Sequence, residues 1–323
     1  MVIELWFVGI KVGIGFLILY AAASVTIRSA AALALDLRLS KVLVGVVILA
    51  FGTSLPEACV SFFAAWTNNT GLAVGNVLGS NIANIGLVLG VTALVRPVIY
   101  TRQAVKSEIL CVLLSGVTVT LFMADRALSR LESAVLLSIC IGYILYLVRC
   151  KKDLCESECE PAFSSRQDGT GKRLRHILFV AAGFAGLVFG SGVFVDGAIG
   201  VARYFHIPEW VIGLTLVAVG TSVPELATAV VATVKRESSF VVGNIMGSNA
   251  LNVFFILAIV GLIRPVTMAD TKFIEQLGFF LFFSIMPYPL MYFGGKIGRV
   301  KGAVLLGLYA GYIVWIARNF VTQ

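Results

Sequence analysis

The chain has 323 residues, of which 59% are hydrophobic and only 13% are charged, and its mean hydropathy is +0.97. A soluble domain of this length does not have such a composition, whereas a polytopic membrane protein does. The net charge of +8 could indicate nucleic-acid binding, but the distribution of the basic residues along the chain, described below, argues against it.

Apolar stretches of about 17 to 25 residues are long enough to cross a bilayer core roughly 30 Å thick. With no water in that core, each must be a helix that satisfies its own backbone groups. The first stretch carries Glu4 ahead of its apolar run and lacks a basic leader, so we do not expect a cleaved signal peptide. The ten expected segments are about 7–27, 42–66, 72–95, 107–123, 132–148, 177–202, 210–233, 240–263, 274–293 and 302–317.

The second segment is interrupted at 52–57 by the sequence GTSLPE. Pro56 has no N–H and clashes with the carbonyl of Gly52, so the turn before it is expected to open and release backbone carbonyls. Unwound backbone at this depth is tolerated only where it lines a site. Four residues in this part of the second segment share one helical face by their spacing. They are Ala50, Thr53, Ser54 and Glu57.

The third segment carries Ser80 and Asn84, which are four residues apart and therefore share a face. After the fifth segment comes a polar stretch, 149–176, which is rich in charge, Ser, Gly and Cys. Its cysteines, Cys150, Cys155 and Cys159, match no zinc-binding spacing, and no cofactor is expected. This stretch divides the chain into two sets of five segments.

The second set repeats the first. GTSLPE at 52–57 recurs as GTSVPE at 220–225, and the 24 residues at 75–98 recur at 243–266 with 11 identities, both at an offset of 168 residues. Because five is odd, the second copy crosses the membrane in the opposite sense, an arrangement that recurs in secondary transporters. The sequence therefore predicts an all-α polytopic membrane protein with two inverted five-helix repeats, 1–148 and 177–323, joined by a loop at 149–176. The second copy supplies Ala218, Thr221, Ser222, Glu225, Ser248 and Asn252.

The two glutamates, Glu57 and Glu225, lie deep in apolar segments. An ionised carboxylate there is costly unless it is paired or faces a polar cavity. No Lys or Arg lies at matching depth in the sequence, so the charge must come from an external cation. Carboxylates, carbonyls, hydroxyls and amide oxygens form a hard ligand set that suits Ca²⁺ or Na⁺; Mg²⁺ fits less well because it resists losing its waters.

The distribution of Lys and Arg sets the expected orientation. With the N-terminus outside, eighteen basic residues fall in inside loops and six in outside loops, which is the positive-inside pattern. We therefore expect a plasma-membrane protein whose loop 149–176 is cytoplasmic, with the lipid bilayer as its surroundings. Neither nucleic acid nor an obligate protein partner is indicated.

The paired GTSxPE and GNxxGSNxxN motifs resemble the α-repeats of the sodium/calcium exchangers, within the cation/calcium exchanger superfamily. This resemblance implies that Glu57 and Glu225 bind Ca²⁺ together with the carbonyls of Thr53 and Thr221. It implies flanking Na⁺ sites and a central position faced by two asparagines. The residues implied for these are Ser54, Ser80, Ser222 and Ser248, with the carbonyls of Ala50 and Ala218, and Asn84 and Asn252 at the centre.

Asn252 stands where some prokaryotic and potassium-dependent members carry Asp, so the resemblance argues against a potassium requirement. Two carboxylates neutralise one Ca²⁺, and Na⁺ ions on the same oxygens would compete with it. Exchange of three Na⁺ for one Ca²⁺, if the family's ratio holds, would be electrogenic.

Three alternatives remain to be weighed. A proton/calcium antiporter is possible because buried glutamates can carry protons. A passive cation channel is compatible with the composition, although inverted repeats with broken helices favour alternating access. An intramembrane metalloprotease would need an HExxH-type motif, and the only histidines are His176 and His206, so no enzyme is expected.

Overall fold

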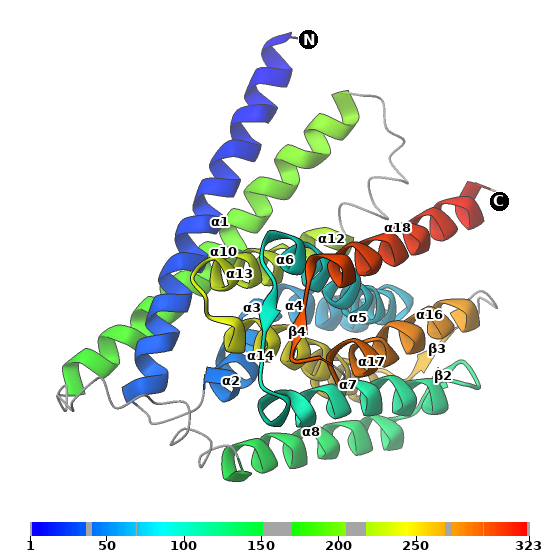
Figure 1. Cartoon of the computed structure of the whole chain (residues 1–323). Coiled ribbons are helices and arrows are strands. Elements are labelled where there is room, and N and C mark those ends of the chain that lie inside the picture. Colours follow the sequence, from blue (N-terminus) through cyan, green and yellow to red (C-terminus); the bar gives the residue numbers. More distant parts are fainter. Residues whose placement is uncertain are drawn as a thin grey trace.

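The computed structural model describes residues 2–36, 41–68, 70–150, 170–204, 218–268, 273–292 and 294–321, and these residues are mostly helical (Figure 1). The first half of the chain contains helices α1 (Val2–Asp36), α2 (Lys41–Val44), η1 (Gly45–Leu49), α3 (Ala50–Thr53), α4 (Leu55–Trp66), α5 (Thr70–Ala83), η2 (Asn84–Val88), α6 (Leu89–Val95), α7 (Arg102–Phe122) and α8 (Arg130–Cys150). The two-residue strands β1 (Val98–Ile99) and β2 (Ala127–Leu128) lie between these helices.

The second half repeats this order. Its helices are α10 (Thr170–Tyr204), α12 (Ala218–Thr221), α13 (Val223–Val234), α14 (Ser238–Leu251), η4 (Asn252–Leu257), α15 (Ala258–Ile263), α16 (Phe273–Ile285), α17 (Pro287–Tyr292) and α18 (Arg299–Val321), with strands β3 (Val266–Thr267) and β4 (Lys296–Ile297). The π-helical turns η2 and η4 begin at Asn84 and Asn252, which are equivalent residues of the two repeats. Such turns in α-helices frequently mark functional sites.

The prediction of a polytopic helical membrane protein is confirmed. Among the described residues, eight helices are long and apolar enough to cross a membrane, and the bent pair Gly45–Thr53 and Leu55–Trp66 raises the number to nine. The expected segment 210–233 falls partly outside the described residues, and its described part contains the shorter apolar helix Val223–Val234. The expected ten spanning segments are therefore consistent with the structure, in which eight or nine are seen among the described residues.

Helices α1 and α10 extend beyond the apolar limits read from the sequence. Each has 35 residues, roughly 50 Å at 1.5 Å per residue, which exceeds the bilayer core. They pack along each other beside the other helices (Figure 1). Because α10 begins at Thr170, residues 170–176 are helical, although the sequence placed them in the loop. Apolar content marks only the bilayer-spanning part of a helix, so it missed this polar end.

The two halves interlock through two short antiparallel ribbons. Strand β1 pairs with β4, and β2 pairs with β3, so each ribbon joins one strand from each half. Val98 and Val266, which are equivalent in the repeats, occupy corresponding ribbons. Helix α8 of the first half packs on α15 of the second, and α18 packs on α6 in the same way. Neither half therefore forms its packing surfaces alone.

The core of the molecule is formed by the third helix of each half. These helices span 70–95 and 238–263. In the 18-residue stretch of each that was compared, 78% and 83% of the residues are buried, whereas the share in α1 is 22%. Gly243 of α14 meets Gly45 of η1, where an added Cβ would lie 3.1 Å from the opposite Cα. This close approach of two backbones brings α14 against the interrupted second helix.

Candidate cation site

The helix that carries GTSLPE is broken at Ser54. Its two parts are bent by 55°, and Ser54 adopts φ −83° and ψ 8° between them. Ser222 has nearly the same conformation, φ −89° and ψ 6°, between α12 and α13. The predicted interruption is thus confirmed in both repeats.

The prolines account for the position of the break. Pro56 cannot donate to the carbonyl of Gly52, whereas the N–H of Ser54 still donates to the carbonyl of Ala50 at 3.0 Å. The new helix begins at Leu55 and places Glu57 in its first turn, and Glu225 lies likewise in the first turn of α13. Helix N-termini favour negative charge, so the break also stabilises each carboxylate, which the sequence analysis did not anticipate.

The two glutamates are held by the opposite repeat. Ser54 Oγ donates to Glu225 Oε1 at 3.0 Å, and Ser222 Oγ donates to Glu57 Oε1 at 3.3 Å. Both glutamates are fully buried, and within the described chain the second oxygen of each carboxylate has no hydrogen-bond donor. Each carboxylate therefore keeps one buried oxygen available for a cation.

The threonine hydroxyls are occupied by neighbouring amides. Thr53 Oγ1 donates to Asn244 Oδ1 at 3.2 Å, and Thr221 Oγ1 approaches Asn76 Oδ1 at 3.5 Å. These contacts again join opposite repeats at equivalent positions. Thr53 and Thr221 can offer an ion their backbone carbonyls, and the oxygen of each hydroxyl keeps lone pairs that can also accept.

The third helices contribute further buried oxygens. Ser248 Oγ contacts the carbonyl of Ala50 at 3.5 Å, which places these two residues of opposite repeats together. Besides the glutamates, three of the predicted site residues keep buried polar atoms that have no hydrogen-bond partner among the described residues. These are Ser80 Oγ, both carboxamide atoms of Asn84, and Asn252 Oδ1. Buried polar groups are normally satisfied, so these atoms are candidate ligand atoms.

Hydrogen bonds and close contacts thus join most of the predicted residues across the repeats, and Ala218 is located by its backbone in α12. Four buried or half-buried asparagines were missed by the sequence analysis: Asn76, Asn81, Asn244 and Asn249. A signal for them existed, because they recur at the offset of 168 residues within apolar helices. Among the described residues no group of three His, Cys, Asp or Glu side chains gathers, so carbonyl, hydroxyl and amide oxygens must complete any ligand set.

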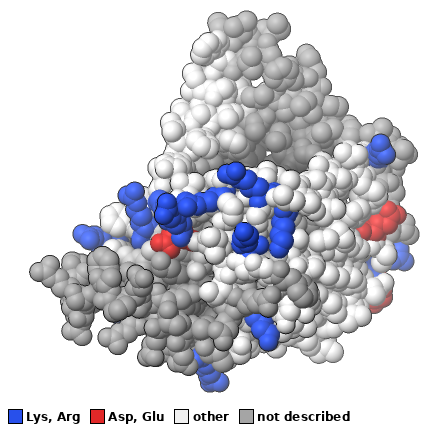
Figure 2. Space-filling view, viewed as in Figure 1, with Lys and Arg blue, Asp and Glu red and all other residues white. Residues whose placement is uncertain are grey.

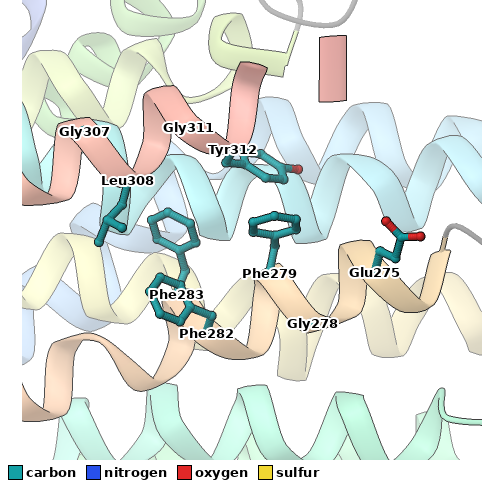
Figure 3. Close-up of a pocket in the computed structure, with 9 residues that line it drawn as sticks. All are labelled: Glu275, Gly278, Phe279, Phe282, Phe283, Gly307, Leu308, Gly311 and Tyr312. Carbon is teal, nitrogen blue, oxygen red and sulfur yellow. The ribbon is translucent and has the colours of Figure 1, made fainter. Parts of the chain in front are cut away.

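A separate cavity of about 490 Å³ lies between α16 and α18 (Figure 3). Aromatic rings such as Phe279 and Tyr312 and the bare backbone of Gly307 line it, and Glu275 is its one carboxylate. This lining is apolar and contains none of the predicted ligands. The cavity is therefore distinct from the cation site.

Comparison with known proteins matches nearly the whole chain. A family model described as sodium/calcium exchanger protein matches residues 8–149 and 175–318. The putative antiporter CaxA of Alkalimonas amylolytica is 33% identical over 307 residues, covering 93% of this chain and 95% of that protein. The sodium/calcium exchanger MaX1 of Methanosarcina acetivorans is 30% identical, covering 93% and 96%. A structure of the sodium-calcium exchanger NCX_Mj superimposes with a TM-score of 0.79 at 28% identity, covering 94% of this chain and 98% of that one.

Proposed function

The chain belongs to the sodium/calcium exchanger family, and from that premise we propose that it is a secondary active antiporter that exchanges Na⁺ for Ca²⁺. One observation carries the proposal: two fully buried glutamates, one from each repeat, each present an unpaired oxygen. Within the described chain, no cationic side chain is seen at either carboxylate. A pair of buried carboxylates in a membrane requires a counter-charge, and a transported cation supplies it.

The ligand assignment follows the geometry and the family resemblance together. Glu57 and Glu225, with the carbonyls of Thr53 and Thr221, would hold Ca²⁺. The serine hydroxyls contact the same carboxylates, so Na⁺ ions bound through them would share oxygens with Ca²⁺ and compete for them. The remaining proposed ligands are Ser80, Ser248, Asn84, Asn252 and the carbonyls of Ala50 and Ala218.

The charge of the site supports an electrogenic, potassium-independent cycle. Two carboxylates bound to one Ca²⁺ are neutral, whereas the same carboxylates with three Na⁺ carry one positive charge. Moving that charge through the membrane potential is worth about 2.3 kcal/mol per 100 mV. Asn252 adds no third carboxylate that would favour an extra cation such as K⁺.

The surface supports the orientation expected from the sequence. Figure 2 shows Lys and Arg side chains gathered in the region that β4 occupies in Figure 1, whereas the region of β2 and β3 carries both signs. A hydrogen bond of 3.4 Å from Ile99 N to Ser238 Oγ brings the basic turn at 235–236 to the β1–β4 side. We therefore propose that this side faces the cytoplasm.

Flux measurements on purified protein in liposomes test the function. An outward Na⁺ gradient should drive ⁴⁵Ca²⁺ uptake above its equilibrium distribution, with no requirement for K⁺ and with net charge movement. Uptake driven by a proton gradient and not by Na⁺ would identify a proton/calcium antiporter. Calcium flux that only follows its own gradient would identify a channel, and either result would contradict the proposal.

A further inference from the structure

A reciprocal pair of asparagines joins the two repeats beside the cation site. Asn81 Nδ2 donates to the carbonyl of Asn249 at 3.1 Å, and Asn249 Nδ2 donates to the carbonyl of Asn81 at 3.2 Å. Both side chains are about 2% exposed or less, and they are separated by the repeat offset of 168 residues. The pair therefore relates the third helices of the two repeats by the same symmetry as the glutamates.

The backbone carbonyls determine how these two side chains are turned. A carbonyl oxygen can only accept, so each carboxamide must direct its Nδ2 to the opposite backbone. The Oδ1 of Asn81 is consequently directed elsewhere, and it accepts a hydrogen bond from Asn252 Nδ2 at 3.0 Å. Asn252 must use its nitrogen for this bond because Asn81 offers only oxygen.

The same constraint turns the other end of Asn252 outward from the pair. Its Oδ1 is buried and has no donor among the described residues, and the whole side chain is fully buried. An oriented buried oxygen without a donor is a ready cation ligand, whereas an amide nitrogen in its place would repel a cation. One backbone carbonyl thus sets the polarity of a side chain two hydrogen bonds away.

We infer that Asn81 is a positioning residue that turns Asn252 Oδ1 toward the central cation, an inference that rests on the proposed function. The hydrogen bonds from the backbone through Asn81 to Asn252 form a relay. The equivalent relay in the other repeat, in which Asn84 would donate to Asn249 Oδ1, is not formed. Asn249 Oδ1 has no partner within the described chain, and neither carboxamide atom of Asn84 has one. The first repeat therefore leaves its asparagine free, while the second repeat has its asparagine fixed.

This asymmetry supplies a matched control. Asn81→Leu and Asn249→Leu each remove one equivalent bond to the opposite backbone, but only Asn81→Leu removes the acceptor that holds Asn252. Equilibrium ⁴⁵Ca²⁺ binding to the purified full-length protein should show a dissociation constant about tenfold higher for Asn81→Leu, because a neutral hydrogen bond is worth roughly one such factor. Asn249→Leu should change it by less than about twofold, while both should lower the melting temperature similarly.

A double-mutant cycle separates positioning from packing. In the Asn252→Leu protein, adding Asn81→Leu should raise the dissociation constant no further, since Asn81 acts through Asn252. If the leucine variants do not fold, Asn81→Ala and Asn249→Ala provide the same comparison with smaller side chains. Equal calcium affinities for the Asn81 and Asn249 variants would overturn the inference. If the unmodified protein does not bind calcium, the proposed function is refuted, and so is the positioning role of Asn81 that rests on it.

Discussion

The two repeats of this protein are alike around the carboxylates and different around the asparagines of their third helices. In each repeat the serine at the helix break donates to the glutamate of the other, and the threonine beside it contacts an asparagine of the other. Asn252, by contrast, donates to Asn81, while Asn84 has no side-chain partner in the described chain. The duplicated sequence thus combines glutamates in symmetric surroundings with asparagines in asymmetric ones.

This difference has a physical basis. In the proposed exchange cycle, the same pair of carboxylates would face both sides of the membrane in turn, so the hydrogen bonds that hold them benefit from symmetry. Each neutral asparagine would contribute less binding energy than a carboxylate. One of them can therefore be held by a hydrogen bond while the other is not. The contrast teaches that sequence symmetry fixes which atoms are available, whereas the hydrogen bonds around them decide which are oriented.

The largest expected effect tests the symmetric part of the comparison. Glu57→Gln and Glu225→Gln should each abolish calcium exchange, a loss of more than about 100-fold, because Gln keeps the shape but removes the charge that balances the ion. The two losses should be similar, since each carboxylate accepts a hydrogen bond from the serine at the helix break of the opposite repeat. Sodium-driven ⁴⁵Ca²⁺ uptake in liposomes, with thermal melts to check folding, measures both. Near-normal flux from either variant would contradict the site assignment.

A smaller and unequal effect is expected at the asparagines. Asn252→Ala removes an oriented ligand and should raise the calcium concentration for half-maximal uptake about tenfold. Asn84→Ala removes a buried side chain whose carboxamide no hydrogen bond orients within the described residues, so it should raise that concentration only about threefold. The same uptake assay across a calcium series separates the two. Equal effects, or a larger effect at Asn84, would show that the hydrogen bond to Asn81 has no functional consequence.

A change of charge at the same position sharpens the comparison further. Asn252→Asp can keep its bond to Asn81 Oδ1 only while the new carboxyl carries a proton, because two oxygens without a hydrogen repel. Transport by this variant should survive but become more dependent on pH in the neutral range. The unmodified protein should not require K⁺. Uptake measured against pH, with and without K⁺, provides the test. An unchanged pH profile would indicate that position 252 does not face the ions.

The smallest effect is expected outside both repeats. Replacing 151–169, which lies between α8 and α10, with a Gly/Ser linker of equal length should leave ion selectivity and the half-maximal calcium concentration within about twofold of the original, because flexible polar linkers impose little geometry. The matched comparison is with the intact chain under the same Na⁺ gradient. Altered selectivity would show that this segment contributes to the site.

Much of the fold and site follows from the sequence. Apolar length predicted the spanning helices because a bilayer leaves backbone groups no external partner. The repeat at 168 residues predicted two equivalent halves, and Pro56 predicted the break. Glu57 and Glu225 were recognisable because a carboxylate within an apolar segment is costly unless it is used.

Tertiary structure alone decided how these parts are paired. Ser54 and Glu225 are 171 residues apart, and Asn81 and Asn252 are also 171 apart, so their contacts depend on how two similar halves dock. A symmetric sequence allows each serine to face its own glutamate or the other one. It allows both asparagine relays to form, or only one. Hydrogen-bond direction depends on ångström-scale placement of donors and acceptors, and that placement is set by close helix packing that periodicity along the chain does not specify.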